Sequence, residues 1–224
     1  MPNDLGRKIG YDIKSQVEDA VDFDEHFYHL RKGGHVAAIQ AHRQHHYFAK
    51  IDITNFFYSV SRRRIQTALT ANGIYRARHY AKFSCVRNPF GNPKYSLPYG
   101  FVQSPILATL VLQHSEAGQL LRDVSDEIVV SVYMDDISIS SDDLTALQQV
   151  YDQLIGVLPE NGFEINPAKA VEPHPYLIVF NCDLEQGRTR VTDERIAEFL
   201  ASAPSQEAED AFVSYCVSVE RGNT

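Results

Sequence analysis

Two kinds of apolar spacing alternate along the chain and predict a mixture of strands and helices. Runs with the spacing of an amphipathic helix predict helices at 36–41, 62–69, 104–121, 144–158 and 196–200. Short apolar or alternating runs predict strands at 47–53, 128–133, 137–141, 163–166, 176–181 and 188–192. The segment 84–103 is rich in Pro, Gly and Asn, which predicts an irregular loop. Strands in one layer with helices packed behind them predict an α+β domain.

An acidic pair stands between two of the predicted strands. Residues 133–136 read Tyr-Met-Asp-Asp, so Asp135 and Asp136 lie at the tip of a predicted hairpin. Their charges repel one another, and hard divalent cations such as Mg²⁺, which prefer carboxylate oxygens, relieve that repulsion. An acidic turn without a catalytic role is the alternative, because Asp is common in turns.

A third acidic residue, Asp52, ends the predicted strand 47–53 just before a Phe pair. An Asp in this position commonly caps the next helix. Two-metal phosphoryl transfer, however, needs a third carboxylate that converges on the other two, because the two ions lie about 3.5–4 Å apart and share ligands. Asp52 supplies this carboxylate if its strand lies beside the hairpin.

The charge of the chain is uneven. The 224 residues carry a net charge of −8. Residues 1–95 have 15 Lys or Arg and 8 Asp or Glu, a net charge of +7, whereas residues 96–224 have 6 and 21, a net charge of −15. The basic half suits contact with a phosphate backbone, and a solvated surface with uneven charge is the alternative. The length suits one compact body.

Other features narrow the class of protein. No apolar stretch approaches the roughly 18 residues of a membrane span, so we expect no membrane contact. The three Cys are odd in number and widely spaced, which fits neither a disulfide framework nor a Cys-based zinc site and suggests a reducing cytoplasm. Six His between residues 26 and 46 lack the spacing of a zinc site, and we expect them at the surface or near nucleic acid.

Five segments, taken in order, resemble the palm motifs of reverse transcriptases. The segments that resemble motifs A, B, C and D and the primer grip are 52–57, 97–105, 133–136, 162–169 and 176–184. The resemblance covers about residues 35–190. The short chain, the Phe pair and Tyr99 look most like the small prokaryotic defence-associated and abortive-infection reverse transcriptases.

This resemblance implies a right-hand polymerase palm, which is an antiparallel sheet backed by helices, with abbreviated fingers and thumb. We expect partial fingers in residues 1–47 and a palm in residues 48–187. We also expect an inserted fingers segment at about 62–98 and a short thumb-like segment in 188–224.

The resemblance also assigns catalytic roles. Asp52 and Asp135 would bind both Mg²⁺ ions, with Mn²⁺ as the alternative metal, and Asp136 would support them. The backbone carbonyl of Ile53 would complete the inner metal shell. Lys169 matches the motif D lysine proposed to protonate the leaving pyrophosphate, and a solvated surface lysine is its alternative reading.

Further residues would contact the nucleotide. Phe57 stands where the family places the steric gate that excludes a 2′-hydroxyl, although core packing explains it equally well. Met134 would line the sugar of the nucleotide. Gly100 retains the backbone of the loop that the family has in motif B. Tyr99 replaces the usual Gln that contacts the incoming nucleotide. Arg43 is a candidate for holding the triphosphate or a plain surface charge.

The resemblance therefore predicts a nucleotidyltransferase, an RNA-directed DNA polymerase that copies an RNA template with dNTPs into DNA, in bacterial anti-phage defence. Tyr99 suggests the first alternative, a template-independent or protein-primed polymerase of the same fold. The acidic half and the short thumb suggest the second, a non-catalytic RNA-binding subunit. The short thumb also predicts a protein partner, an RNA or a second copy that completes it.

Overall fold

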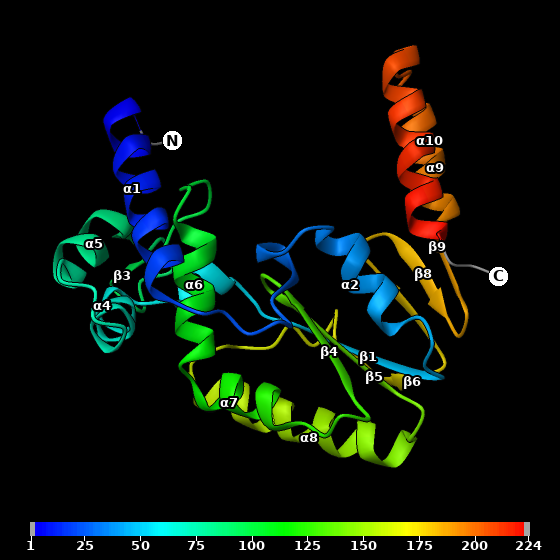
Figure 1. The fold of residues 1–224 in the computed structure, drawn as a ribbon, viewed down its shortest axis with the longest axis horizontal. Helices are drawn as coiled ribbons and strands as arrows, with labels where there is room; N and C mark the ends of the chain where they lie inside the picture. Colours follow the sequence, from blue (N-terminus) through cyan, green and yellow to red (C-terminus); the bar gives the residue numbers. More distant parts are fainter. Residues whose placement is uncertain (1–2, 222–224) are drawn as a thin grey trace.

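The computed structural model describes residues 3–221 as a central sheet with a lobe on either side (Figure 1). The strands are β1 (Tyr47–Asp52), β2 (Val86–Arg87), β3 (Tyr95–Ser96), β4 (Val129–Tyr133), β5 (Asp136–Ser141), β6 (Val171–His174), β7 (Tyr176–Val179), β8 (Cys182–Glu185) and β9 (Arg188–Val191). The helices are α1 (Asp4–Ala20), the 3₁₀ helix η1 (Tyr28–Leu30), α2 (Gly34–His42), α3 (Phe56–Ser59), α4 (Arg62–Ala71), α5 (Ala77–Ser84), α6 (Ser104–Gln113), α7 (Glu116–Asp123), α8 (Leu144–Glu160), α9 (Asp193–Ala201) and α10 (Gln206–Glu220).

The central sheet is antiparallel and has the strand order β4-β5-β1-β6. Its register places Ile51 opposite Ile137 and Asp52 opposite Asp136. Because successive side chains point to opposite faces, the two Ile lie on one face and the two Asp on the other. The predicted α+β palm is confirmed, and one end of one face carries the acidic residues.

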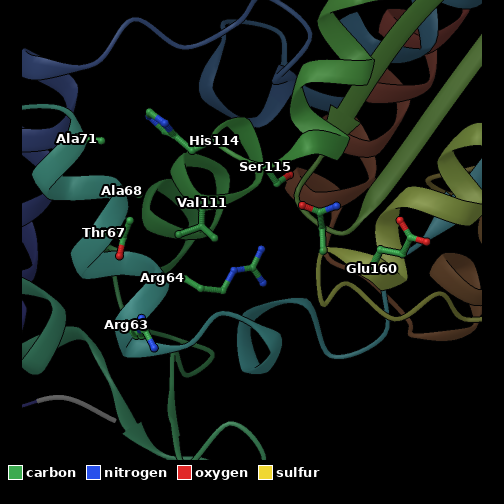
Figure 2. A pocket seen from close by; sticks show the side chains of 10 residues that line it. Arg63, Arg64, Thr67, Ala68, Ala71, Val111, His114, Ser115 and Glu160 are labelled. Carbon is green, nitrogen blue, oxygen red and sulfur yellow. The ribbon is translucent and has the colours of Figure 1, made fainter.

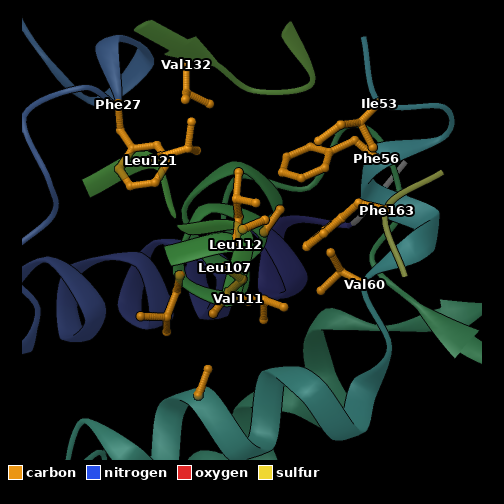
Figure 3. Close-up of a cluster of buried hydrophobic side chains, with 14 of the residues drawn as sticks. Phe27, Ile53, Phe56, Val60, Leu107, Val111, Leu112, Leu121, Val132 and Phe163 are labelled. Carbon is orange, nitrogen blue, oxygen red and sulfur yellow. The ribbon is translucent and has the colours of Figure 1, made fainter. Parts of the chain in front are cut away.

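The main core lies behind the sheet and around α6 (Figure 3). Helix α8 packs along β1, β5 and β6, and Ile51 and Ile137 are almost fully buried. Eight of the ten residues of α6 are buried, since this helix is surrounded by other elements. Phe56 and Phe163 belong to the same core, so the segments that follow Asp52 and α8 are anchored in it.

Helix α2 covers the far half of the carboxylate face through a buried His. The ring of His42 lies between the hydroxyl of Ser140 on β5, 2.7 Å from Nδ1, and that of Ser131 on β4, 2.7 Å from Nε2. Burial, and to a smaller extent the neighbouring His45, lower the pKa of His42 to about 3. The expectation that the His of this region lie at the surface is therefore wrong for His42, because its ring satisfies two buried hydroxyls.

Two lobes flank the central sheet. On one side, α1, α4, α5 and the β2–β3 hairpin form a fingers-like lobe (Figure 1). On the other, the sheet β7-β8-β9 packs with α2 and Phe48 in a second core and carries α9 and α10. In this part of the described chain, α9 buries no residue and α10 buries only Val219. Phe199 of α9 stacks on Phe212 of α10 at 4.0 Å, whereas α10 also packs on α2 and β9 through Tyr215 and Val219.

One predicted helix and one predicted strand are wrong. The helix expected over 104–121 breaks after Gln113, where Ser115 caps α7 by accepting a hydrogen bond from Gly118. A Cβ on Gly118 would lie 2.3 Å from the Leu112 carbonyl oxygen, so the tight turn between α6 and α7 depends on this glycine. The strand expected at 163–166 is reduced to one bridge, between Ile53 and Ile165.

The sequence patterns also omitted several elements. The sequence did not predict helices α1, α3, α5 and α10 or strands β2, β3, β6 and β8. The capping of α4 by Ser61 and the β4–β5 hairpin are confirmed. Strand β9 pairs with β8, so the segment 188–224 begins inside the small sheet. No helix within residues 3–221 is both long and apolar enough to cross a membrane.

We expect the buried His42 to make stability depend on pH. Its pKa of about 3 in the folded state lies below the ordinary value of 6.5, so the unfolded chain binds a proton that the folded chain does not. This contribution is complete above pH 6.5 and is lost as the pH falls towards 3. In chemical denaturation at stepped pH, His42→Gln should flatten the slope by up to about 1.4 kcal/mol per pH unit. The exposed His79→Gln is the control, and equal slopes in both variants would contradict the role of burial.

Candidate active site

Three acidic residues converge where β1 meets the β4–β5 hairpin. Asp52 ends β1 and faces Asp136, the first residue of β5. Asp135 lies in the turn between β4 and β5, and its carbonyl oxygen accepts a hydrogen bond of 2.9 Å from the backbone N–H of Ile53. The sequence prediction that the strand of Asp52 lies beside the hairpin is confirmed, since this bond ties the two segments together.

The turn of the hairpin is held by a His that the sequence prediction missed. Met134 has a left-handed backbone, with φ of 59°, which is unfavourable for a residue with a side chain. Its N–H donates to Nδ1 of His29 at 3.2 Å. Nε2 of the same ring donates to the Thr109 hydroxyl at 2.7 Å, because that hydroxyl itself donates to the Pro105 carbonyl. His29 thus connects the turn to α6, and burial lowers its pKa to about 4, so the ring is neutral near pH 7.

Two Lys neutralise two of the carboxylates. Lys169 Nζ lies 3.0 Å from Oδ2 of Asp52, and Lys50 Nζ lies 2.8 Å from Oδ1 of Asp136. The side chain of Lys169 is 59% exposed, whereas that of Lys50 is 14% exposed. Among the residues that the structure describes, Oδ1 of Asp136 has no hydrogen bond in addition to this ion pair. Lys169 can therefore swing into solvent, and Lys50 cannot.

Asp135 has no such Lys partner in the part of the chain that the structure describes. Burial raises the pKa of its carboxyl, and the charges of Asp136 and Asp52 raise it further. Conversely, a hydrogen bond with Asp52 and the charge of that residue raise the pKa of Lys169. The site therefore has excess negative charge at Asp135, which favours the approach of a cation.

Lys169 is brought to Asp52 by the loop that follows α8. In this loop the N–H of Asn166 donates to the Asp52 carbonyl at 2.9 Å, and the N–H of Thr54 donates to the Glu164 carbonyl at 2.8 Å. These two bonds lie on either side of the Ile53–Ile165 bridge. The loop thus continues the sheet for one residue pair and then turns Lys169 back over the carboxylates.

An aromatic group stands beside the carboxylates. Phe57 is buried, and its ring meets the ring of Tyr99 edge-on, with centroids 4.9 Å apart. Tyr99 is half exposed and also contacts Tyr58 at 5.4 Å. Burial raises the pKa of the Tyr99 hydroxyl, and the charge of Asp135 adds to this, which locates Tyr99 near the acidic residues.

The loop that carries Tyr99 has a defined shape. Gly100 has a φ of +81°, a conformation that residues with a side chain rarely adopt, so glycine is needed there for its backbone. The hydroxyl of Ser104 donates to the Pro98 carbonyl at 2.7 Å and closes the loop onto the start of α6.

The candidate role of Arg43 in holding a triphosphate is wrong on geometry. Its side chain is buried, and its Nε donates to the Gly187 carbonyl at 3.0 Å, while the Gly187 N–H donates back to the Arg43 carbonyl at 2.8 Å. Arg43 precedes β1, at the end of the strand away from Asp52, so it fixes the turn between β8 and β9.

The acidic residues suit a hard divalent cation by their chemistry, because all three donors are carboxylates. Within residues 3–221, no three His, Cys, Asp or Glu side chains are gathered as a ready-made metal cluster. Instead, Lys169 and Lys50 each engage one of the carboxylates. The roles of Ile53 and Met134 toward metal and sugar stay predictions.

Solved structures of polymerases share this fold. The telomerase of Candida albicans, in complex with a fragment of telomeric RNA, matches with a TM-score of 0.61 and 13% identity over 80% of this chain and 36% of that one. The foamy viral protease–reverse transcriptase in complex with an RNA/DNA hybrid matches with a TM-score of 0.52 and 17% identity over 81% and 20%. The chain thus spans about a third or less of these proteins, and identities this low show the fold alone.

The sequence itself points the same way. No curated protein matches the chain. The profile of the family described as "Reverse transcriptase (RNA-dependent DNA polymerase)" matches residues 1–194, which is most of the chain and includes every motif residue discussed above. With the palm sheet and its three converging Asp, this match shows that the chain belongs to the reverse transcriptase family of nucleotidyltransferase polymerases.

Proposed function

We propose that the chain is an RNA-directed DNA polymerase that extends a primer with dNTPs. The observation that carries this proposal is the meeting of Asp52, Asp135 and Asp136 at the end of β1 and the β4–β5 hairpin, with Lys169 above them. Membership of the family supports templated synthesis on RNA. The product would be DNA and the substrates dNTPs.

The three Asp would hold two Mg²⁺ ions, or Mn²⁺ in their place. When bound, such ions activate the primer 3′-hydroxyl and stabilise charge on the leaving pyrophosphate. Lys169 would leave Asp52 as the cations enter and face the pyrophosphate instead. A lysine ammonium group is protonated near neutral pH. Asp52 holds the pKa of Lys169 above its ordinary value, so Lys169 would donate a proton more readily once it has left Asp52. Lys50 stays with Asp136, which makes Asp136 a supporting residue.

Phe57 and Tyr99 would select the sugar and the base pair. The buried Phe57 ring, held edge-on by Tyr99, is a rigid wall next to the acidic site. A rigid wall at this point excludes a 2′-hydroxyl by contact rather than by a hydrogen bond. Gly100 would let the nucleotide approach the backbone of the loop, and Met134 would line the sugar.

The small α9–α10 unit supports the proposal that something else completes the thumb, either a protein partner, an RNA or a second copy. On resemblance, the biological role would be bacterial anti-phage defence. The three free Cys suit a reducing cytoplasm. Tyr99 favours the second candidate function, template-independent or protein-primed synthesis, because it stands where the family contacts the templating pair. A non-catalytic RNA-binding subunit is the remaining candidate.

The first experiment measures incorporation of labelled dNTPs and NTPs with Mg²⁺, on a primed RNA template and without template. We expect template-dependent dNTP incorporation, and Asp135→Asn should reduce it by about a thousandfold or more, since metal ligands supply several kcal/mol to the transition state. Asp142→Asn removes an exposed acid from the far end of the hairpin and is the control. Synthesis without template would support the second candidate, and no synthesis in any condition would leave the RNA-binding subunit.

Sugar selection is tested by Phe57→Val. Shortening this wall should lower the preference for dNTPs over NTPs by about tenfold or more. Phe48→Leu is the matched control, because Phe48 is fully buried in the second core and should affect stability without affecting the preference. An unchanged preference in Phe57→Val would show that Phe57 is only a core residue.

The two Lys should behave differently when each is replaced by Met. Lys169→Met removes an exposed cation from Asp52, so binding of Mn²⁺, followed by electron paramagnetic resonance, should tighten several-fold with less than about 1 kcal/mol change in stability. Lys50→Met leaves the largely buried Asp136 without its partner and should lower the free energy of unfolding by about 2–3 kcal/mol. Equal stability losses in the two variants would contradict the difference in burial.

A further inference from the structure

Within the fingers-like lobe, α4, α5 and the β2–β3 hairpin come from a stretch without any acidic residue. Between Asp52 and Glu116 the chain has eight Lys or Arg and no Asp or Glu. Three of these cations begin α4, as Arg62, Arg63 and Arg64, and they point in different directions. Arg62 lies over the ring of Tyr95 at 4.6 Å, and Arg63 is exposed. The third, Arg64, turns inward.

Arg64 points into a cavity of about 410 Å³ between α4, the end of α6 and the end of α8 (Figure 2). The walls on either side come from segments far apart in sequence, because α4 follows motif A and residues 160–161 end α8. This cavity is separate from the acidic site, and none of its lining residues has a role in the proposed reaction.

The guanidinium of Arg64 has no counter-charge. It is half-buried and lies 4.3 Å over the ring of Phe163. Within residues 3–221 it makes no ion pair and no side-chain hydrogen bond. Burial lowers the pKa of Arg64 to about 10, which still leaves the group charged near pH 7. The contact with Phe163 offsets part of the desolvation, but the five N–H donors of the guanidinium still require acceptors.

The surroundings of Arg64 offer further groups to an anion. Arg63 lines the same cavity and also has no ion-pair partner among the described residues. Thr67 on the next turn of α4 adds a hydroxyl group, whereas the Ser115 hydroxyl already donates to the Leu112 carbonyl. Glu160 is the one acid in the lining of the cavity, and it is exposed at the end of α8.

We propose that this cavity binds a phosphate ester group, held by the guanidinium groups of Arg64 and Arg63. A guanidinium presents a planar fork of donors that matches two oxygens of a phosphate. The volume lies within the range of sites for small molecules and is large enough for one nucleotide unit. The phosphate belongs either to a free nucleotide or to one link of a nucleic-acid strand, and these sources share the same chemistry.

Occupancy would reach the acidic site through packing. Arg64 lies on Phe163, whose ring packs on Phe56, four residues after Asp52. Phe163 also begins the loop that delivers Lys169 to Asp52. A ligand that fixes Arg64 therefore stabilises the loop that carries Lys169.

The test is a binding measurement without dNTPs or divalent metal, so its result does not depend on polymerisation. The probes are inorganic phosphate, deoxyadenosine 5′-monophosphate and a short fluorescent single-stranded oligodeoxythymidylate, followed by thermal shift for the first two and by anisotropy for the third. Arg64→Gln should weaken binding by about tenfold or more, because charge-assisted hydrogen bonds are lost. Glu160→Gln, which removes the repelling acid, should tighten binding several-fold.

Arg87→Gln is the matched control, because it removes one exposed charge from the same lobe outside the cavity. Equal losses in Arg64→Gln and Arg87→Gln would overturn the proposal and indicate only a general attraction of the basic lobe for anions. Failure of all three probes to bind the wild-type chain would overturn it as well. Binding of the free nucleotide assigns the site to a small molecule, and binding of the oligonucleotide alone assigns it to a strand. The opposite sign expected for Glu160→Gln keeps the proposal testable if Arg64→Gln folds poorly.

Discussion

The register between β1 and β5 is the constraint on which the site depends. It sets Asp52 directly opposite Asp136, and like charges placed opposite each other on neighbouring strands destabilise a sheet. A shift of β5 by one residue would remove this repulsion, but it would also turn Ile137 and Ile139 out of the core. The apolar face therefore holds the acidic face in an unfavourable arrangement, and Lys50 and Lys169 compensate for it from two different sides.

The two lysines that compensate for this repulsion are attached to the site in different ways. Lys50 belongs to β1 itself, so its charge is fixed relative to Asp136 as part of the sheet. Lys169 comes from a loop 117 residues further along the chain than Asp52 and reaches the site only because that loop adds to the sheet at Ile53. The charge of Lys50 therefore stays beside Asp136, whereas the charge of Lys169 can leave Asp52. A site of this kind can keep its shape when another cation replaces the ammonium group of Lys169.

Much of this arrangement follows from local signals in the sequence. The β4–β5 hairpin and the position of Asp52 could be predicted because strand periodicity and acidic residues coincide there. The break between α6 and α7 and the helix α1 also had local signals, namely the caps Ser115 and Asn3, which the apolar spacing outweighed. The roles of His29, His42 and Arg43 had none. Each depends on partners about 80 to 145 residues away, and no local sequence pattern indicates that a polar side chain will be buried.

The weak attachment of α9 has a consequence for how the molecule unfolds. With no buried residue in α9, and with Ile196 as its one side chain against the second core in the described chain, little apolar surface is exposed when this helix detaches. Its amide hydrogens should therefore exchange with solvent through a local opening, at a much lower free energy than those of β1 and β5. The second core, which α10 helps to build, stays closed during that opening.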